Sequence, residues 1–322
     1  MPADYLTIPS ADLIARAVRA VIAGRDLRDA AAGADIDIAD LEDAIGTYHA
    51  AGTAALEQRA SSRWQHVSIG FTDPESSEQT GANVIGPLLD GLQAEGDVAC
   101  WWFLRKPPGW RIRMLDASPT AVGAALARLS EGGVIGSWRP ELYEPEVHAF
   151  GGPAGMGIAH GLFCGDSQGV LDYLRNAKPP LGRRELSVLL ISAMLSTAGL
   201  DWSERGDVFA RVAGMRPDPP PAPPEQAGLL ASQLRTLLAA PPQAAAVAFT
   251  PGSQADSGAG WHAAFAQAGR QFADAARHGQ LTRGLRAVLA QTVIFHWNRL
   301  GLTAMTQGIL ASAAAQVCLP GD

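Results

Sequence analysis

The sequence has few cysteines, no long hydrophobic run and no surplus of positive charge, and each absence excludes a class of protein. Its three cysteines, Cys100, Cys164 and Cys318, lie far apart and form no CxxC motif. They favour reduced thiols over a disulfide framework, and we expect neither a metal site nor secretion. No stretch reaches the roughly 18–20 apolar residues of a membrane helix, and the N-terminus lacks a signal-peptide pattern. We therefore expect a cytoplasmic protein with no membrane partner.

The balance of charge argues against a nucleic-acid partner. The chain of 322 residues carries 25 Lys and Arg against 32 Asp and Glu, a net charge of −7. Residues 1–60 have a helical pattern like that of helix-turn-helix modules, but they hold five Arg against ten acidic residues, which suits DNA poorly. We expect a small helical N-terminal appendage there, which either packs on the main domain or docks a peptide substrate.

Residues 61–322 have the pattern of one α+β domain. Residues 64–71 alternate apolar and polar side chains, as a half-buried strand does, and two more strands flank a turn at 107–109. With a return strand within 133–146, they predict an antiparallel or mixed sheet with helices on one face.

A large helical C-terminal half follows from residue 153. Six prolines within the first eight residues of 217–225 interrupt it and predict a stiff extended linker inside the domain. The predicted helices span 153–175, 183–199, 201–213, 225–240, 260–279, 281–300 and 302–317.

The segment ACWWFLRKPPGWRIRM (99–114) concentrates indoles and cations on the predicted hairpin. Alternation places Trp101 and Arg105 on one face of their strand, and Arg111 and Arg113 on one face of the next. One face of the hairpin can thus present two or three guanidiniums beside an indole, which suits a carboxylate or a peptide backbone. The alternative is that these arginines only cover apolar surface.

Two other segments place polar groups where chemistry could occur. In VIFHWNRLGL (293–302), His296 and Arg299 lie on one helical face next to Asn298, and a buried guanidinium needs an acidic partner or an anionic ligand. The alternative is a histidine whose hydrogen bonds are satisfied in the core.

The segment LYEPEVHAFGGPAGM (142–156) brings Tyr143, Glu144, Glu146 and His148 before a Gly-Gly turn into a helix, whose first amides could hold an anion. No HExxH or CxxC motif accompanies these residues, so metalloprotease and thiol-redox chemistry have no support.

Four segments together resemble the thiopeptide-type bacteriocin biosynthesis family, over roughly residues 62–317. They are WWFLRKPPGWRIRM, YEPEVHAFGGPAGMGIAHGLFCGDSQGVLDYL, RRELSVLLISAMLSTAGLDWSERGDVFARV and FHWNRLGL, in the family's order. The family includes the C-terminal elimination domain of lantibiotic dehydratases and the stand-alone pyridine synthases of thiopeptide pathways.

This resemblance implies work on a ribosomally made precursor peptide, leader and modified core, with no cofactor. In pyridine synthesis, two dehydroalanines undergo a formal [4+2] aza-cycloaddition after one amide becomes an iminol, and water and the leader peptide are then lost. In elimination, glutamate leaves a glutamylated Ser or Thr. A third alternative is a non-catalytic subunit that binds the leader or other pathway enzymes. We favour pyridine synthesis.

The resemblance also implies roles for particular residues. The family's hairpin arginines match Arg105, Arg111 or Arg113, and its C-terminal histidine matches His296. The motif ERYGG of elimination members reads HAFGG here, so Ala149 replaces a cation that a glutamate clamp would use.

For pyridine synthesis, we expect proton transfer by His296, Tyr143 and Glu146, with Arg105 acting at the reacting amide. The expected substrate-binding residues are Arg111, Arg113, Trp101, Trp138, His148, Asn298 and Arg299, of which the two tryptophans would stack on azole rings.

Overall fold

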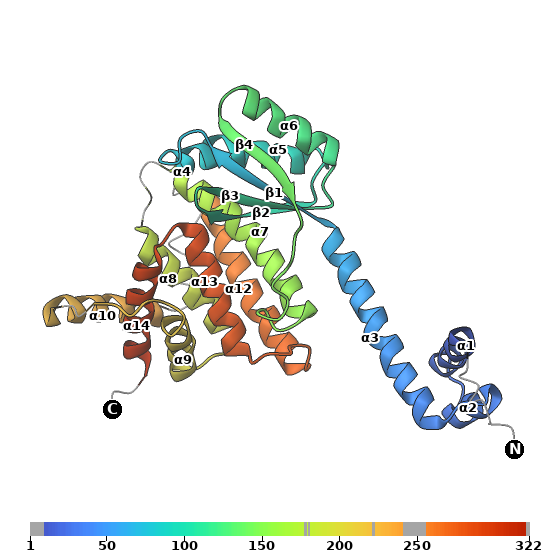
Figure 1. Cartoon of the computed structure of the whole chain (residues 1–322). Coiled ribbons are helices and arrows are strands. Elements are labelled where there is room, and N and C mark those ends of the chain that lie inside the picture. Colours follow the sequence, from blue (N-terminus) through green and yellow to red (C-terminus); the bar gives the residue numbers. More distant parts are fainter. Residues whose placement is uncertain (1–9, 177–178, 180, 221–222, 241–255, 320–322) are drawn as a thin grey trace, which may run out of the picture. The chain divides into compact units, whose positions relative to one another are not determined.

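The computed structural model describes residues 10–176, 179, 181–220, 223–240 and 256–319, and they divide into two compact units (Figure 1). The first unit ends at Ser62 and the second begins at Arg63. None of the helices in the described ranges is long and apolar enough to cross a membrane.

The N-terminal unit consists of three helices, α1 Ala11–Ile22, α2 Leu27–Ala34 and α3 Ile38–Ser62. The side chain of Ser10 accepts a hydrogen bond from the backbone at the start of α1, and Asp26 does the same for α2. The core of this unit is small, with Val18 and Leu41 as its largest buried side chains.

The second unit begins with a four-stranded antiparallel sheet in the order β2-β3-β1-β4. Its strands are β1 Trp64–Phe71, β2 Cys100–Lys106, β3 Gly109–Leu115 and β4 Ile135–Glu141. The fold class is therefore α+β, as the sequence predicts. The hairpin turn is shorter than expected: Lys106 pairs with Gly109, so only Pro107 and Pro108 lie between the strands.

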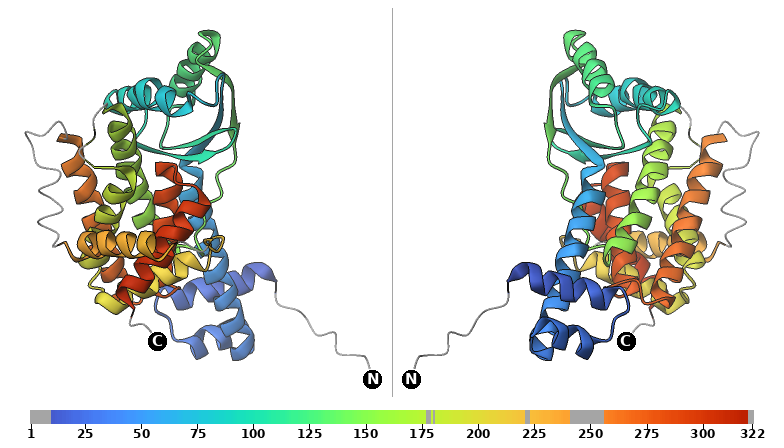
Figure 2. Two further views of the ribbon diagram at one scale, coloured as in Figure 1. Left: turned by 90° about the vertical axis from the view of Figure 1, so that its left-hand side faces the viewer. Right: turned by 90° about the vertical axis from the view of Figure 1, so that its right-hand side faces the viewer.

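Helices cover both faces of the sheet, not one face as predicted (Figures 1 and 2). On one face lie α4 Ser77–Thr80, the π-helical turn Gly81–Ile85, α5 Gly86–Ala94 and α6 Pro119–Glu131. The indole of Trp110 packs on Gly81, where a Cβ would lie 2.0 Å from the ring. The opposite face carries Trp102, whose ring centre lies 4.9 Å from that of Phe163 on α7 (Pro153–Arg175). The prediction of helices on one face was wrong because alternation of apolar and polar residues within a strand does not show which helices pack on each face of the sheet.

The C-terminal half is a bundle of helices whose apolar side chains continue the core of the sheet. Its helices are α7 Pro153–Arg175, α8 Arg183–Thr197, α9 Trp202–Ala213, α10 Pro224–Ala239, α12 Asp256–Arg277, α13 Leu285–Leu300 and α14 Ala304–Cys318. Glycines allow close approach of these helices: a Cβ on Gly169 of α7 would lie 2.2 Å from the ring of Trp261 on α12.

Two boundaries differ from the prediction for local reasons. Pro224, assigned to the linker, begins α10 one residue before the expected start at Glu225, because proline is favoured at the first helical position; residues 221 and 222 of the linker lie outside the described part. The helix expected from residue 281 begins at Leu285, because the backbone N–H of Thr282 donates to the carbonyl of Gly151 (2.9 Å).

Candidate functional site

The sheet face that packs against α7 carries a buried arginine that has no acidic hydrogen-bond partner. Arg113 is 7% exposed, and its guanidinium lies 4.3 Å from the ring centre of Trp102 and 5.0 Å from that of Tyr143. Within the described part of the chain, its Nε and Nη1 have no hydrogen-bond partner. Burial lowers the pKa of Arg113 to about 10, so the group remains a cation at neutral pH. A buried cation with free donors is suited to receive an oxygen atom of a ligand.

A tyrosine–histidine pair lies beside this guanidinium. The hydroxyl of Tyr143 is 2.7 Å from Nε2 of His160, which projects from α7. Burial raises the pKa of Tyr143, and burial together with the charge of Arg113 lowers the pKa of His160 to about 4. Both groups are therefore neutral at pH 7. They can offer a hydrogen bond to a substrate oxygen without first separating charge.

Two residues that the sequence reasoning did not single out complete this part of the site. His160 lies in an apolar helix, where a histidine usually belongs to the core, and only its place within the quoted segment 143–174 could have drawn attention to it. His66 on β1 lies beside Arg113, its paired residue on the neighbouring strand β3. Its Nε2 is 3.6 Å from the carboxylate of Glu141. Burial, and then the charge of Arg113, lower the pKa of His66.

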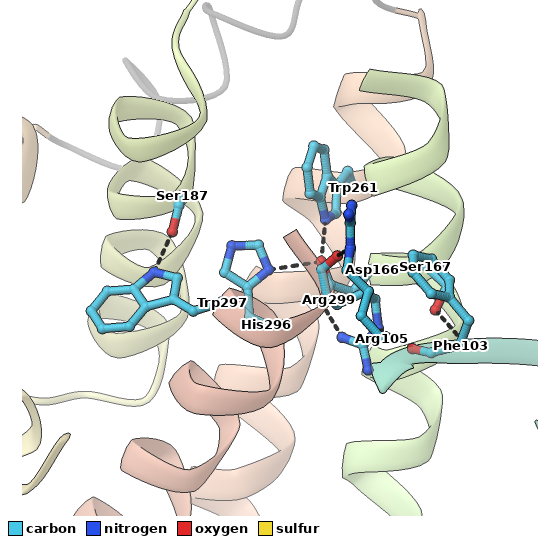
Figure 3. Close-up of polar contacts among 9 residues, drawn as sticks. All are labelled: Phe103, Arg105, Asp166, Ser167, Ser187, Trp261, His296, Trp297 and Arg299. Carbon is cyan, nitrogen blue, oxygen red and sulfur yellow. Dashed lines mark hydrogen bonds and ion pairs between the residues drawn. The ribbon is translucent and has the colours of Figure 1, made fainter. Parts of the chain in front are cut away.

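The second predicted pair, His296 and Arg299, forms a separate buried cluster around Asp166 (Figure 3). Nδ1 of His296 is 2.9 Å from Asp166 Oδ1, Trp261 Nε1 donates to the same oxygen (2.8 Å), and Arg299 forms an ion pair with Oδ2. Burial alone would raise the pKa of Asp166, but His296 and Arg299 outweigh it, and the net pKa lies below the ordinary value. The spacing correctly predicts that the two side chains project together, and their acidic partner is Asp166.

This cluster joins four elements, α7, α12, α13 and β2. Arg299 Nε donates to the carbonyl of Phe103 on β2 (3.0 Å), so α13 is held to both α7 and the sheet. The ring of His296 is 1% exposed and packs against Phe265, with ring centres 4.9 Å apart. The guanidinium of Arg299 is 5.8 Å from the ring centre of Trp102, which connects the cluster to the Arg113 site.

Arg105 is part of neither the Arg113 site nor the cluster around Asp166. This corrects the expectation that all three hairpin arginines could share a face. It pairs across the hairpin with Trp110, on the face opposite Arg111 and Arg113. It forms an ion pair with Glu78, and its Nε donates to the carbonyl of Arg299 (2.8 Å). The two-residue turn fixes this register, which alternation within each strand leaves open.

The remaining predicted residues lie at other positions around the domain. Trp101 is fully buried and Trp138 lies opposite Ile69, both on the face away from Arg113, so their predicted stacking on a substrate has no support. The amide oxygen of Asn298 accepts a hydrogen bond from Gln307 of α14 (2.9 Å).

The acidic segment before α7 is nearer to the site. Glu144, Glu146 and His148 are exposed there, and the charge of Glu146 acts on both Arg113 and Tyr143. Arg111 is half-buried beyond Arg113 on the same sheet face.

Residues 165–169 read GDSQG, a match to the hydrolase pattern GxSxG, but their geometry does not fit a nucleophile. They lie within α7 and not at a strand-to-helix turn. Ser167 is fully buried, and its Oγ accepts a hydrogen bond from the backbone N–H of Phe103 (3.1 Å). Among the residues that the structure describes, no group of three or more His, Cys, Asp or Glu could hold a metal ion.

An antiparallel sheet packed on a helical half, with a buried cation and a neutral Tyr–His pair between them, defines a domain that can bind and polarise a polar ligand. The chain belongs to the lantibiotic biosynthesis dehydratase C-terminal family, whose model matches residues 64–318. This confirms the family resemblance inferred from the four sequence segments.

Solved structures share the fold at low sequence identity. The tRNA-dependent lantibiotic dehydratase MibB from Microbispora sp. 107891 is 17% identical with a TM-score of 0.58, covering 79% of this chain but only 28% of MibB. TsrL is 16% identical with a TM-score of 0.53, covering 80% of this chain and 99% of TsrL. The pyridine synthase TbtD from thiomuracin biosynthesis is 14% identical with a TM-score of 0.49, covering 80% and 97%. Among curated proteins, none matches the chain.

Proposed function

We propose that this protein is a pyridine synthase that matures a ribosomally made peptide by formal [4+2] aza-cycloaddition between two dehydroalanines, with loss of water and the leader peptide. Family membership supports the substrate class. The observation that carries the reaction is the neutral Tyr143–His160 pair, 2.7 Å apart, next to Arg113 donors that have no partner within the described ranges.

The cycloaddition requires one peptide amide to react as its iminol, so electron density must build on the amide oxygen. The donors of Arg113 and the hydroxyl of Tyr143 suit an amide oxygen lying between them, where fixed donors stabilise developing charge. Holding two distant dehydroalanines together is itself a large part of the catalysis, because it turns their encounter into an intramolecular step.

His296 has a positioning role in this account. It holds Asp166, which holds Arg299, and Arg299 borders Trp102 under the site. Glu146 is exposed and its charge acts on Tyr143, so it remains our candidate for exchanging protons with solvent.

Glutamate elimination is the second candidate, and the placement of Arg111 and Arg113 on one sheet face favours it. Two observations count against it. Arg105 is paired with Glu78 on the other face, and position 149, where elimination members carry arginine, is alanine. A site that binds the carboxylates of glutamate would therefore contain only two arginines from the hairpin, Arg111 and Arg113.

Two incubations followed by mass spectrometry, together with a binding measurement on the leader peptide, separate the alternatives. A precursor with two dehydroalanines and azoles should give a product lighter by water and the leader peptide. Loss of glutamate from a glutamylated peptide, with no ring formed from the first substrate, would establish elimination. Binding of the leader with no change to either substrate would leave a non-catalytic subunit.

A further inference from the structure

The half of the sheet face that extends beyond Arg113 forms a shallow pocket of about 270 Å³, here called the basic pocket. Two rows of paired residues build it. Arg111, Ser68 and Arg139 lie side by side on β3, β1 and β4, and the next row contains Gly109, Gly70 and Ser137, with Lys106 beyond. Its lining combines small residues with the long cationic side chains of Lys106, Arg111 and Arg139.

The charges of the basic pocket are unbalanced. Lys106, Arg111 and Arg139 contribute three cations, and Glu141 is the one carboxylate among the residues that line it. Glu141 is paired with Arg139 (2.7 Å). Arg111 and Lys106 have no acidic partner within the described ranges of the chain. In a protein of net charge −7, this is a local site for an anion.

The spacing of the pocket suits a carboxylate side chain. Arg111 and Arg139 lie on the strands either side of β1, which places their backbones about 10 Å apart. Arg139 and Ser68 both hydrogen-bond Glu141, so an incoming carboxylate meets the donors of Arg111 and Lys106 and shares Arg139 with Glu141.

The basic pocket and the buried part of the site follow one another along β3. Arg111 and Arg113 are two residues apart on β3, a separation of about 7 Å along the strand. An extended peptide advances by the same distance in two residues. At the inner end of this path, Arg113 is 7% exposed, and two of its donor atoms have no partner in the part of the chain that the structure describes.

We propose that the basic pocket binds an acidic side chain of the peptide substrate, two residues away from the residue whose amide oxygen lies at Arg113. The position of that amide rests on the proposed function; the carboxylate-binding pocket itself does not. Arg111 and Arg139 then act as specificity-determining residues, and they select a substrate with an acidic residue near the reacting one.

Binding of fluorescein-labelled peptides, followed by anisotropy at low salt, tests this proposal on the full-length protein. Each peptide has one dehydroalanine, and a glutamate stands two residues before it, two residues after it or six residues away. Matched peptides have glutamine instead. We expect glutamate at one of the two near positions to tighten binding about ten-fold over glutamine, as a charge-assisted pair does. Glutamate six residues away should give no gain.

The double variant Arg111→Gln/Arg139→Gln should lose this preference, with an unchanged urea unfolding midpoint. The matched control Arg277→Gln, an exposed arginine of α12 paired with Asp274, should keep it. Equal binding of glutamate and glutamine peptides, equal gains at all positions, or a preference that survives in the double variant would overturn the proposal.

This outcome is separable from that of the proposed function. A glutamate preference without pyridine formation leaves the pocket in place and rejects the reaction. Pyridine formed with the same kcat/KM from glutamate and glutamine substrates rejects the pocket and keeps the reaction.

Discussion

At the scale of single residues, the charge states of a few buried groups decide what the site can do. Tyr143 and His160 are both neutral at pH 7, and Arg113 is a cation whose Nε and Nη1 have no hydrogen-bond partner among the residues that the structure describes. Such a set stabilises charge that develops on a ligand oxygen better than it transfers a full proton to or from a charged base.

Substitution of this pair should reduce turnover with little effect on folding. We expect Tyr143→Phe and His160→Gln each to lower kcat about 100-fold, the usual range for losing such a group, and the double variant to lose little more because the two act as a unit. Steady-state kinetics with the dehydroalanine precursor measures this, with exposed His278→Gln as the control. A His160→Gln variant with wild-type kcat would contradict the role.

Asp166 should matter chiefly for stability. In Asp166→Asn, the buried Arg299 loses its counter-ion, and breaking a buried pair in this way costs about 3–5 kcal/mol. The exposed pair of Asp274 and Arg277 offers a matched control, for which Asp274→Asn should cost less than about 1 kcal/mol. Urea unfolding measures both, and equal effects would contradict the structural role of the cluster.

Stability should also fall in mildly acidic solution. The pKa of His160 is about 4 in the folded chain against about 6.5 when unfolded. Below pH 6.5 the unfolded chain therefore binds a proton that the folded chain does not. The free energy of unfolding should decrease by up to about 1.4 kcal/mol per pH unit per such histidine, until the folded pKa is reached.

His66, whose pKa is also lowered, contributes in the same sense. Urea titrations between pH 7 and pH 5 test this. The slope should become shallower in His160→Gln, and an identical slope in that variant would show that His160 is not held neutral.

At the scale of helices and strands, close packing of α7 against α12 positions the residues of the site. Gly169 lies under the ring of Trp261, whereas Gly161 on the same helix has no atom of a neighbouring element within 4 Å of where a Cβ would be. We expect Gly169→Ala to destabilise the protein by about 1–3 kcal/mol through overpacking. Gly161→Ala should stabilise it by about 0.4–1 kcal/mol, because alanine lowers the entropy of the unfolded chain. Urea unfolding distinguishes them, and the same sign for both would contradict this packing.

The helices and strands were largely predictable from local patterns. The contacts between them, such as strand register and side-chain pairs, were not. Alternation identifies β1 and the hairpin, and the 3.6-residue period identifies α7 and α13, because these signals need only a few neighbouring residues. The register that separates Arg105 from Arg113 depends on the turn between their strands. The pairing of His296 with Asp166 joins residues 130 positions apart. No local pattern carries that information.

At the scale of the whole molecule, charge is distributed unevenly. Residues 1–60 are strongly acidic, and the sheet face of the second unit carries the basic pocket. The family model begins at residue 64, so the chemistry that we propose belongs to the second unit, and the N-terminal unit stays a candidate for contact with the precursor or with other pathway enzymes.

The central claim is that the second unit forms a pyridine ring from two dehydroalanines. High-resolution mass spectrometry of one azole-bearing precursor with two dehydroalanines, incubated with the purified protein, tests it most directly. We predict a macrocycle lighter than the precursor by water and the leader peptide, together with the released leader as its amide. A precursor that binds but keeps its mass and both dehydroalanines, under conditions in which the protein is folded, would contradict the claim.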